Sequence, residues 1–108
     1  MQVLAYVEAF GGCPFQRWFA DIDPQATAKI TIALTRLEQG NFSNVKSVGA
    51  GVFEYRIDFG PGYRVYFGQD GKTLIILLGG GTKQRQQQDI AAAHEQWVDY
   101  KRRKKGTK

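Results

Sequence analysis

The most regular pattern in the chain is an alternation of apolar and polar residues over positions 52–67, which read VFEYRIDFGPGYRVYF. Aromatic or aliphatic residues occupy every second position on both sides of a central Gly60-Pro61-Gly62, which is typical of strands that bury one face. A Gly-Pro-Gly break between two such runs predicts a β-hairpin. We expect one face of this hairpin to pack as core and the other to present Arg56, Arg64 and Tyr66 to solvent.

Two helices are predicted before the hairpin. Pro14 suits the first turn of one helix, and Asp23-Pro24 has the pattern of an N-cap followed by proline at the first helical position of the next. The second helix should end at Gly40-Asn41. Two short helices joined by a tight turn predict an αα-hairpin that covers one face of a sheet. The apolar positions at helical spacing are Phe15, Trp18, Phe19, Ile22, Ala26, Ile30, Ala33, Leu34 and Leu37.

The remaining segments complete an α+β pattern. Short strands are predicted at residues 3–8 and near 46–48, and TLIILL at 73–78 has the composition of a central strand buried on both faces. Gly79-Gly80-Gly81 is expected to end that strand. Residues 83–105 contain no Gly or Pro, which favours a C-terminal helix, with an apolar stripe through Ile90, Ala93, Trp97 and Tyr100. We therefore predict one domain over residues 1–100 and a basic tail over 101–108.

The charge of the chain is concentrated at its end. The 108 residues carry a net charge of +5, but residues 101–108, KRRKKGTK, hold six of the 15 basic side chains and no acidic one. Residues 1–100 hold nine Lys and Arg against ten Asp and Glu, so that part is not basic overall. A basic tail can bind nucleic acid through counterion release, or can serve as a frayed, solubilising terminus. A binding role for the rest of the chain must depend on where its few cations lie.

Several classes of protein are disfavoured by composition. No apolar run approaches the roughly 18 residues that a membrane-spanning helix needs, and we expect no secretion signal. The single Cys13 cannot form an internal disulfide, which fits a reducing cytoplasm. One cysteine and one histidine make a dedicated zinc site improbable, and no metal or cofactor is expected. Gly79–Gly81 is not followed by Lys-Ser/Thr, so it is not a phosphate-binding P-loop.

Three longer segments carry a family resemblance. They are FQRWFADIDPQATAKI, LEQGNFSNVKSVGAGVFEYRIDFGPGYRVYF and LLGGGTKQRQQQDIAAAHEQW, which together span residues 15–97. With these segments the chain resembles the RelE/ParE superfamily of bacterial toxins, and within it the HigB-like, phage-derived "addiction module killer protein" branch. The fold that the resemblance implies is a small, twisted antiparallel sheet with an N-terminal helical hairpin, a C-terminal helix and a positively lined concave surface.

The function implied by the resemblance is that of a type II toxin. Such a toxin is neutralised by a cognate antitoxin, and most members cleave messenger RNA on the ribosome without a metal or other cofactor. Operator DNA would be bound only through the antitoxin complex. A ParE-like minority instead inhibits gyrase without nuclease activity, and a third alternative is an inactive member that only binds its antitoxin.

Arg56, Arg64 and Lys83 match basic positions of the family and are our candidate catalytic residues. Arginine suits this chemistry because its planar guanidinium stays charged and binds phosphate through two nitrogens. Lys83 follows the glycine run, where a nucleic-acid backbone could approach closely. The structural alternative pairs the arginines with Glu54 and Asp58 on a solvated sheet face.

Lys46, Tyr66 and Arg85 are candidate RNA-binding residues, because a basic loop and a base-stacking aromatic would extend such a surface. Tyr66 could equally be a packing residue. His94 is the only side chain with an ordinary pKa near neutrality, but its place beside the apolar stripe favours a packing or surface role. Glu54 is a candidate general base, although a structural salt bridge is the simpler role for it. The general base and acid are therefore left unassigned.

Overall fold

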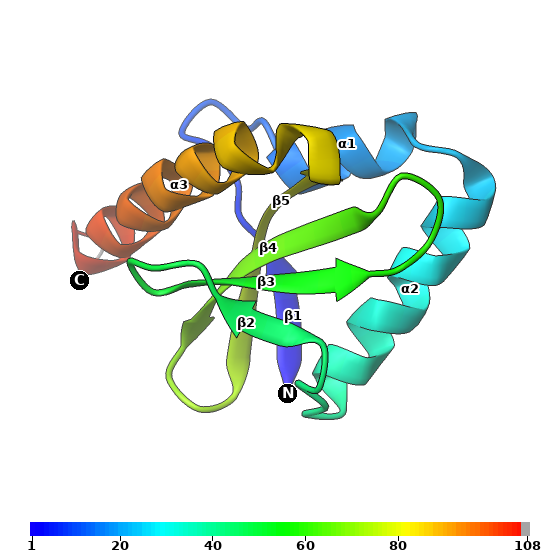
Figure 1. Ribbon diagram of the computed structural model, residues 1–108. Coiled ribbons are helices and arrows are strands. Elements are labelled where there is room, and N and C mark those ends of the chain that lie inside the picture. Colours follow the sequence, from blue (N-terminus) through cyan, green and yellow to red (C-terminus); the bar gives the residue numbers. More distant parts are fainter. Residues whose placement is uncertain (107–108) are drawn as a thin grey trace.

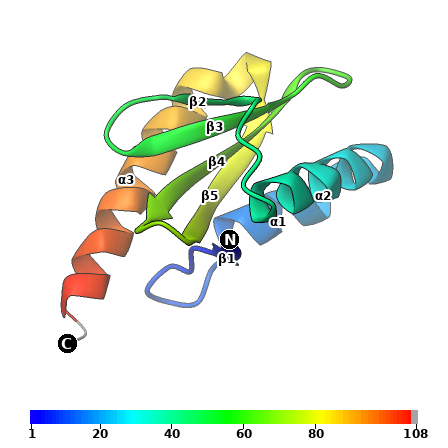
Figure 2. The same cartoon turned by 90° about the horizontal axis from the view of Figure 1, so that it is seen from below.

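The computed structural model describes residues 1–106, which form one mixed five-stranded sheet between two helical layers (Figures 1 and 2). The strand order is β1-β5-β4-β3-β2. The α+β class predicted from the sequence is confirmed. The elements are β1 (Gln2–Ala5), α1 (Pro14–Asp21), α2 (Pro24–Glu38), β2 (Val45–Ser47), β3 (Val52–Ile57), β4 (Tyr63–Asp70), β5 (Leu74–Thr82), a 3-10 turn (Lys83–Arg85) and α3 (Gln86–Gly106).

The helices α1 and α2 cover one face of the sheet, as the αα-hairpin prediction requires (Figure 2). Asp23 is the N-cap of α2, and its carboxylate accepts a hydrogen bond from the backbone nitrogen of Gln25 at 3.1 Å. Gly40 ends this helix with a φ of 78°, a conformation that glycine adopts without strain. The apolar stripe of α2 is buried against the hairpin face that holds Tyr55, Ile57, Val65 and Phe67.

The helix α3 covers the opposite face of the sheet, and Trp97 fixes its position. The indole ring lies directly on the backbone of two glycines. A Cβ atom on Gly68 would fall 2.4 Å from Trp97 Cζ3, and one on Gly51 would fall 2.8 Å from Trp97 Nε1. The predicted stripe of α3 is confirmed, since Ile90, Ala93, Trp97 and Tyr100 all join this second core.

The sheet is mixed, so the expectation of a wholly antiparallel sheet is wrong. β1 pairs in parallel with β5, with Val3 opposite Ile75, while the other neighbouring strands are antiparallel. Parallel pairing requires a crossover connection, and here the chain passes through α1, α2 and three strands before it returns beside β1. β1 is also shorter than predicted and ends at Ala5.

The triple glycine does not end β5, contrary to prediction. Gly79, Gly80 and Gly81 pair with Tyr66, Val65 and Arg64, and the strand continues to Thr82. The glycines make room for side chains from both helical layers. A Cβ on Gly80 would lie 2.2 Å from the Trp18 ring, and one on Gly81 would lie 1.8 Å from Asp89 Oδ2.

The basic segment at the end of the chain is largely helical. Residues 101–106 continue α3, and residues 107–108 lie outside the described part of the chain. Tyr100 and Lys104 both bond to Asp70, which anchors the last turns to the end of β4. Among residues 1–106, no helix has the length and apolar character needed to cross a membrane.

Candidate functional site

The hairpin face that carries Arg64 and Tyr66 is buried beneath α3. The predicted division of the hairpin into two faces is confirmed, because Glu54 lies opposite Tyr66 and Arg56 lies opposite Arg64 in the register of β3 and β4. The expectation that this face presents Arg56, Arg64 and Tyr66 to solvent holds for Arg56 and is wrong for Arg64 and Tyr66. Glu54, Tyr66 and Arg64 are 0%, 1% and 6% exposed, and of the four only Arg56 is exposed.

Glu54 is the centre of a buried polar cluster. Its Oε2 lies 3.5 Å from Arg64 Nε and accepts a 2.9 Å hydrogen bond from the side-chain amide of Gln86, the first residue of α3. Its Oε1 lies 3.8 Å from Lys46 Nζ, which approaches from β2 and is mostly exposed. A carboxylate without contact to water needs such partners, because burying an unpaired charge is strongly unfavourable. One acid therefore shares two basic groups, and the cluster of Glu54, Arg64 and Lys46 is cationic overall.

Two further polar groups point into the same buried layer. Neither the Tyr66 hydroxyl nor Oδ2 of Asp89 has a hydrogen-bond partner within the described chain. Burial, reinforced by the negative charge of Glu54, raises the pKa of Tyr66, so this hydroxyl stays protonated at neutral pH. Burial also raises the pKa of Asp89, although the positive charge of Arg85 opposes the shift.

Arg64 extends from this cluster toward the turn between β3 and β4 while remaining buried. Its Nη1 lies 3.4 Å from the carbonyl oxygen of Gly62, and the backbone nitrogen of Lys83 donates to that same carbonyl at 2.9 Å. A Cβ on Gly62 would lie 3.5 Å from Arg64 Nη1 and 3.6 Å from Lys83 Cβ. The guanidinium of Arg64 and the exposed Lys83 therefore flank one backbone segment, although they are 19 positions apart in sequence.

The other four predicted site residues occupy different positions. Arg56 is exposed directly across from Arg64 and lines a hollow beside α2, together with a second hollow that also contains Lys46. Arg85 is exposed in the 3-10 turn, near Asp89. Tyr66 is buried, so it cannot stack on a base while α3 is in place, and its packing alternative is the one that the fold realises.

His94 has the structural role that its position suggested. Its Nε2 donates to the carbonyl oxygen of Val48 at 2.9 Å, which ties α3 to the loop after β2. Cys13 is half-buried at the start of α1 and forms no disulfide. Within residues 1–106, no group of three His, Cys, Asp or Glu side chains is arranged to hold a metal ion.

Sequence reasoning missed Gln86 and Asp89. Both lie in the first turn of α3, on the face that meets the sheet, and the sequence contained a usable signal. Extending the apolar stripe of Ile90 and Ala93 backwards by one turn places Gln86 four residues before Ile90 and Asp89 four before Ala93. Two polar residues that continue a buried stripe indicate a buried polar layer.

Comparison of the sequence with known proteins identifies the family of this chain. Residues 17–97 match the family described as "Phage derived protein Gp49-like (DUF891)". The chain belongs to this family. The matched region includes β2 to β5 and most of α3, and it therefore holds all six candidate residues of this Gp49-like protein. A Haemophilus influenzae relative, described as "Uncharacterized protein", is 46% identical over 80 residues, which cover 73% of this chain and 81% of the relative.

Proposed function

We propose that this protein is the toxin of a toxin–antitoxin module and cleaves messenger RNA without a metal ion. Family membership supports the first part, because the Gp49-like family is associated with addiction modules. A toxin of this kind requires a separate antitoxin that keeps it inactive. The RelE- and HigB-like resemblance supplies the second part of the proposal, with translated messenger RNA as the substrate.

The observation that carries the nuclease assignment is the meeting of Arg64 and Lys83 at Gly62. In the proposed reaction a ribose 2′-oxygen attacks the neighbouring phosphorus, its proton is removed, and the bond from phosphorus to the 5′-oxygen breaks as that oxygen gains a proton. Negative charge builds on the phosphoryl oxygens, so positioned cations lower the barrier. Glu54 holds the Arg64 guanidinium in place. Arg64 stabilises the negative charge on the phosphoryl oxygens, and Lys83 binds the adjacent RNA backbone.

Arg56 strengthens the proposal because it lies directly opposite Arg64 across the hairpin. Like charges directly opposite each other on neighbouring strands are destabilising. A bound phosphate would relieve this repulsion. Glu54 has no exposed surface, so we assign it to the positioning of Arg64 and not to proton transfer. Lys46 and Arg85 extend the cationic rim on either side.

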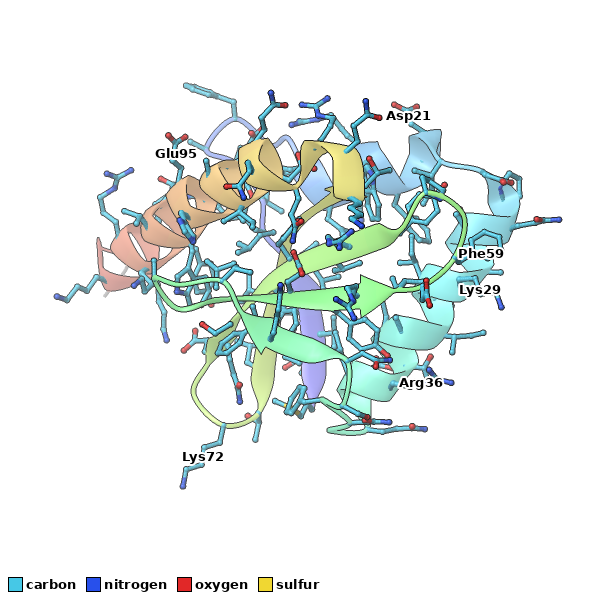
Figure 3. The ribbon with its side chains drawn as sticks, viewed as in Figure 1. Asp21, Lys29, Arg36, Phe59, Lys72 and Glu95 are labelled. Atoms are coloured by element: carbon cyan, nitrogen blue, oxygen red, sulfur yellow. The ribbon has the colours of Figure 1, made fainter. Side chains whose placement is uncertain are left out.

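Primer-extension mapping of cellular transcripts after induction of this chain alone tests the proposal. We expect cuts within translated regions that disappear when translation is blocked. Lys83→Gln should reduce cutting by about 10²-fold, the usual loss when one group that stabilises transition-state charge is removed. Lys72→Gln removes the same charge from the distant turn after β4 and should leave cutting unchanged (Figure 3).

Arg64→Lys supplies a second variant that keeps the buried charge beside Glu54 while removing the planar fork. This variant should fold normally but should cut RNA poorly. Growth arrest with intact transcripts would refute the nuclease assignment and favour a gyrase-directed toxin. Intact transcripts with normal growth would instead indicate a member that only binds its antitoxin.

A further inference from the structure

A basic groove runs along the outer side of the hairpin, apart from the Arg64–Lys83 rim. β2 pairs with residues 53–55, and the backbone nitrogen of Arg56 donates to the carbonyl of Asn44 at 3.1 Å, so the open edge of β3 begins after Arg56. The groove there has a volume of about 200 Å³ and contains Lys29, Arg36 and Arg56, with Asp58 as the one acidic residue of its lining. No ion pair to Arg36 or Arg56 occurs within residues 1–106.

A second hollow continues this groove toward the buried cluster. It is also about 200 Å³ in volume, and it shares Asn44 and Arg56 with the first while adding Lys46. Lys46 in turn reaches Glu54, the partner of Arg64. Basic side chains therefore line both hollows, and Lys46 connects the second hollow to the ion pair of Glu54 and Arg64.

The shape and chemistry of the groove suit a strand better than a single anion. Lys29 and Arg36 are seven residues apart on α2, which places them about 10 Å apart along the helix axis (Figure 3). Between them Ile32 is 49% exposed, and Lys29 Nζ lies 5.6 Å from the centre of the Phe59 ring. Proteins that bind single strands without sequence preference combine a cationic track with exposed apolar or aromatic surface in this way.

We propose that the groove between α2 and β3 binds the sugar-phosphate backbone of single-stranded RNA, outside the phosphodiester that is cleaved. This inference rests on the proposed function for its choice of RNA as the ligand. Lys29 and Arg36 contact successive phosphates, and Arg56 contacts the RNA where it continues toward Arg64. Such an extension holds the substrate without taking part in bond breaking.

Binding of a short, fluorescently labelled RNA with 2′-O-methyl groups tests the groove, because this probe cannot be cleaved. The double variant Lys29→Gln/Arg36→Gln should bind about tenfold more weakly at low salt, measured by fluorescence anisotropy. Its plot of log affinity against log salt concentration should be shallower by about 1.4, since each lost phosphate contact on a single strand reduces the slope by about 0.7. Thermal unfolding should show that this double variant is as stably folded as the wild type.

The matched control is Lys72→Gln/Arg17→Gln, which removes one exposed lysine from the turn after β4 and one exposed arginine from α1. It should keep the wild-type affinity and slope. Equal losses in the two double variants would overturn the groove, as would wild-type binding by Lys29→Gln/Arg36→Gln or no binding by the wild type itself. Transcript mapping is a separate readout, so missing cleavage would refute the nuclease proposal while the anisotropy result still decides the groove.

Discussion

Replacing Glu54 by Gln tests whether the buried cluster depends on one negative charge. Glutamine has nearly the same shape, so packing is preserved while the counter-charge of Arg64 is lost. Removing one partner of a buried ion pair typically costs 3–5 kcal/mol, because the other charge is left uncompensated. Lys46 is mostly exposed, so water replaces part of its lost interaction with Glu54. We therefore expect the lower end, about 3 kcal/mol.

Urea unfolding followed by circular dichroism measures this change as a shift in the free energy of unfolding. For a domain of this size the expected loss corresponds to a fall in Tm of about 12 °C. The matched control is Glu95→Gln, which removes one acid from the exposed side of α3 and should change stability by less than about 0.5 kcal/mol (Figure 3).

A double-mutant cycle separates the ion pair from other effects of the substitution. If Glu54 mainly compensates Arg64, then Glu54→Gln/Arg64→Gln should be more stable than the sum of the single changes predicts, by about 1–3 kcal/mol. A Glu54→Gln protein within about 0.5 kcal/mol of the wild type would refute the reasoning. Strict additivity in the cycle would do the same.

Three further predictions concern the glycine run and two acids of α3. Gly80→Ala should lower the free energy of unfolding by about 1–3 kcal/mol, because a Cβ there would lie 2.2 Å from the Trp18 ring. Gly79→Ala should not cause this loss of stability, because the nearest contact of its Cβ is 3.8 Å away. Urea unfolding of the two variants compares their free energies of unfolding. Burial raises the pKa of Asp89, so Asp89→Asn should be more stable than the wild type at neutral pH, and this advantage should vanish below the ordinary pKa of 3.8. Hydrogen bonds from Tyr6 and Arg102 lower the pKa of Asp99, so Asp99→Asn should be less stable than the wild type at neutral pH. This deficit should shrink as the pH falls through the lowered pKa of Asp99. Thermal melts across pH test both substitutions in α3, and a stability difference from the wild type that stayed constant with pH would contradict the prediction for that substitution.

Local features of the fold could be predicted because their causes lie within a few residues. The Asp23-Pro24 cap, the stripe of α2 and the alternating faces of the hairpin each follow from backbone chemistry or from a repeat of two or 3.6 residues. Of the site, sequence reasoning supplied the cations, and Arg64 and Lys83 prove to be neighbours at Gly62. Sequence reasoning did not identify Gln86 or Asp89 as part of the site, because polar residues are not expected on the buried side of a helix such as α3.

The repeat of apolar residues defines which side chains share a face of each element, whereas long-range packing determines what covers that face. Alternation cannot distinguish a solvated polar face from one buried under a distant helix. Trp97 packs onto Gly51 and Gly68, and this packing brings α3 over Glu54 and Arg64, so the polar face is buried. The same long-range packing keeps the glycine run within β5, because Trp18 and Asp89 occupy the space that side chains there would need.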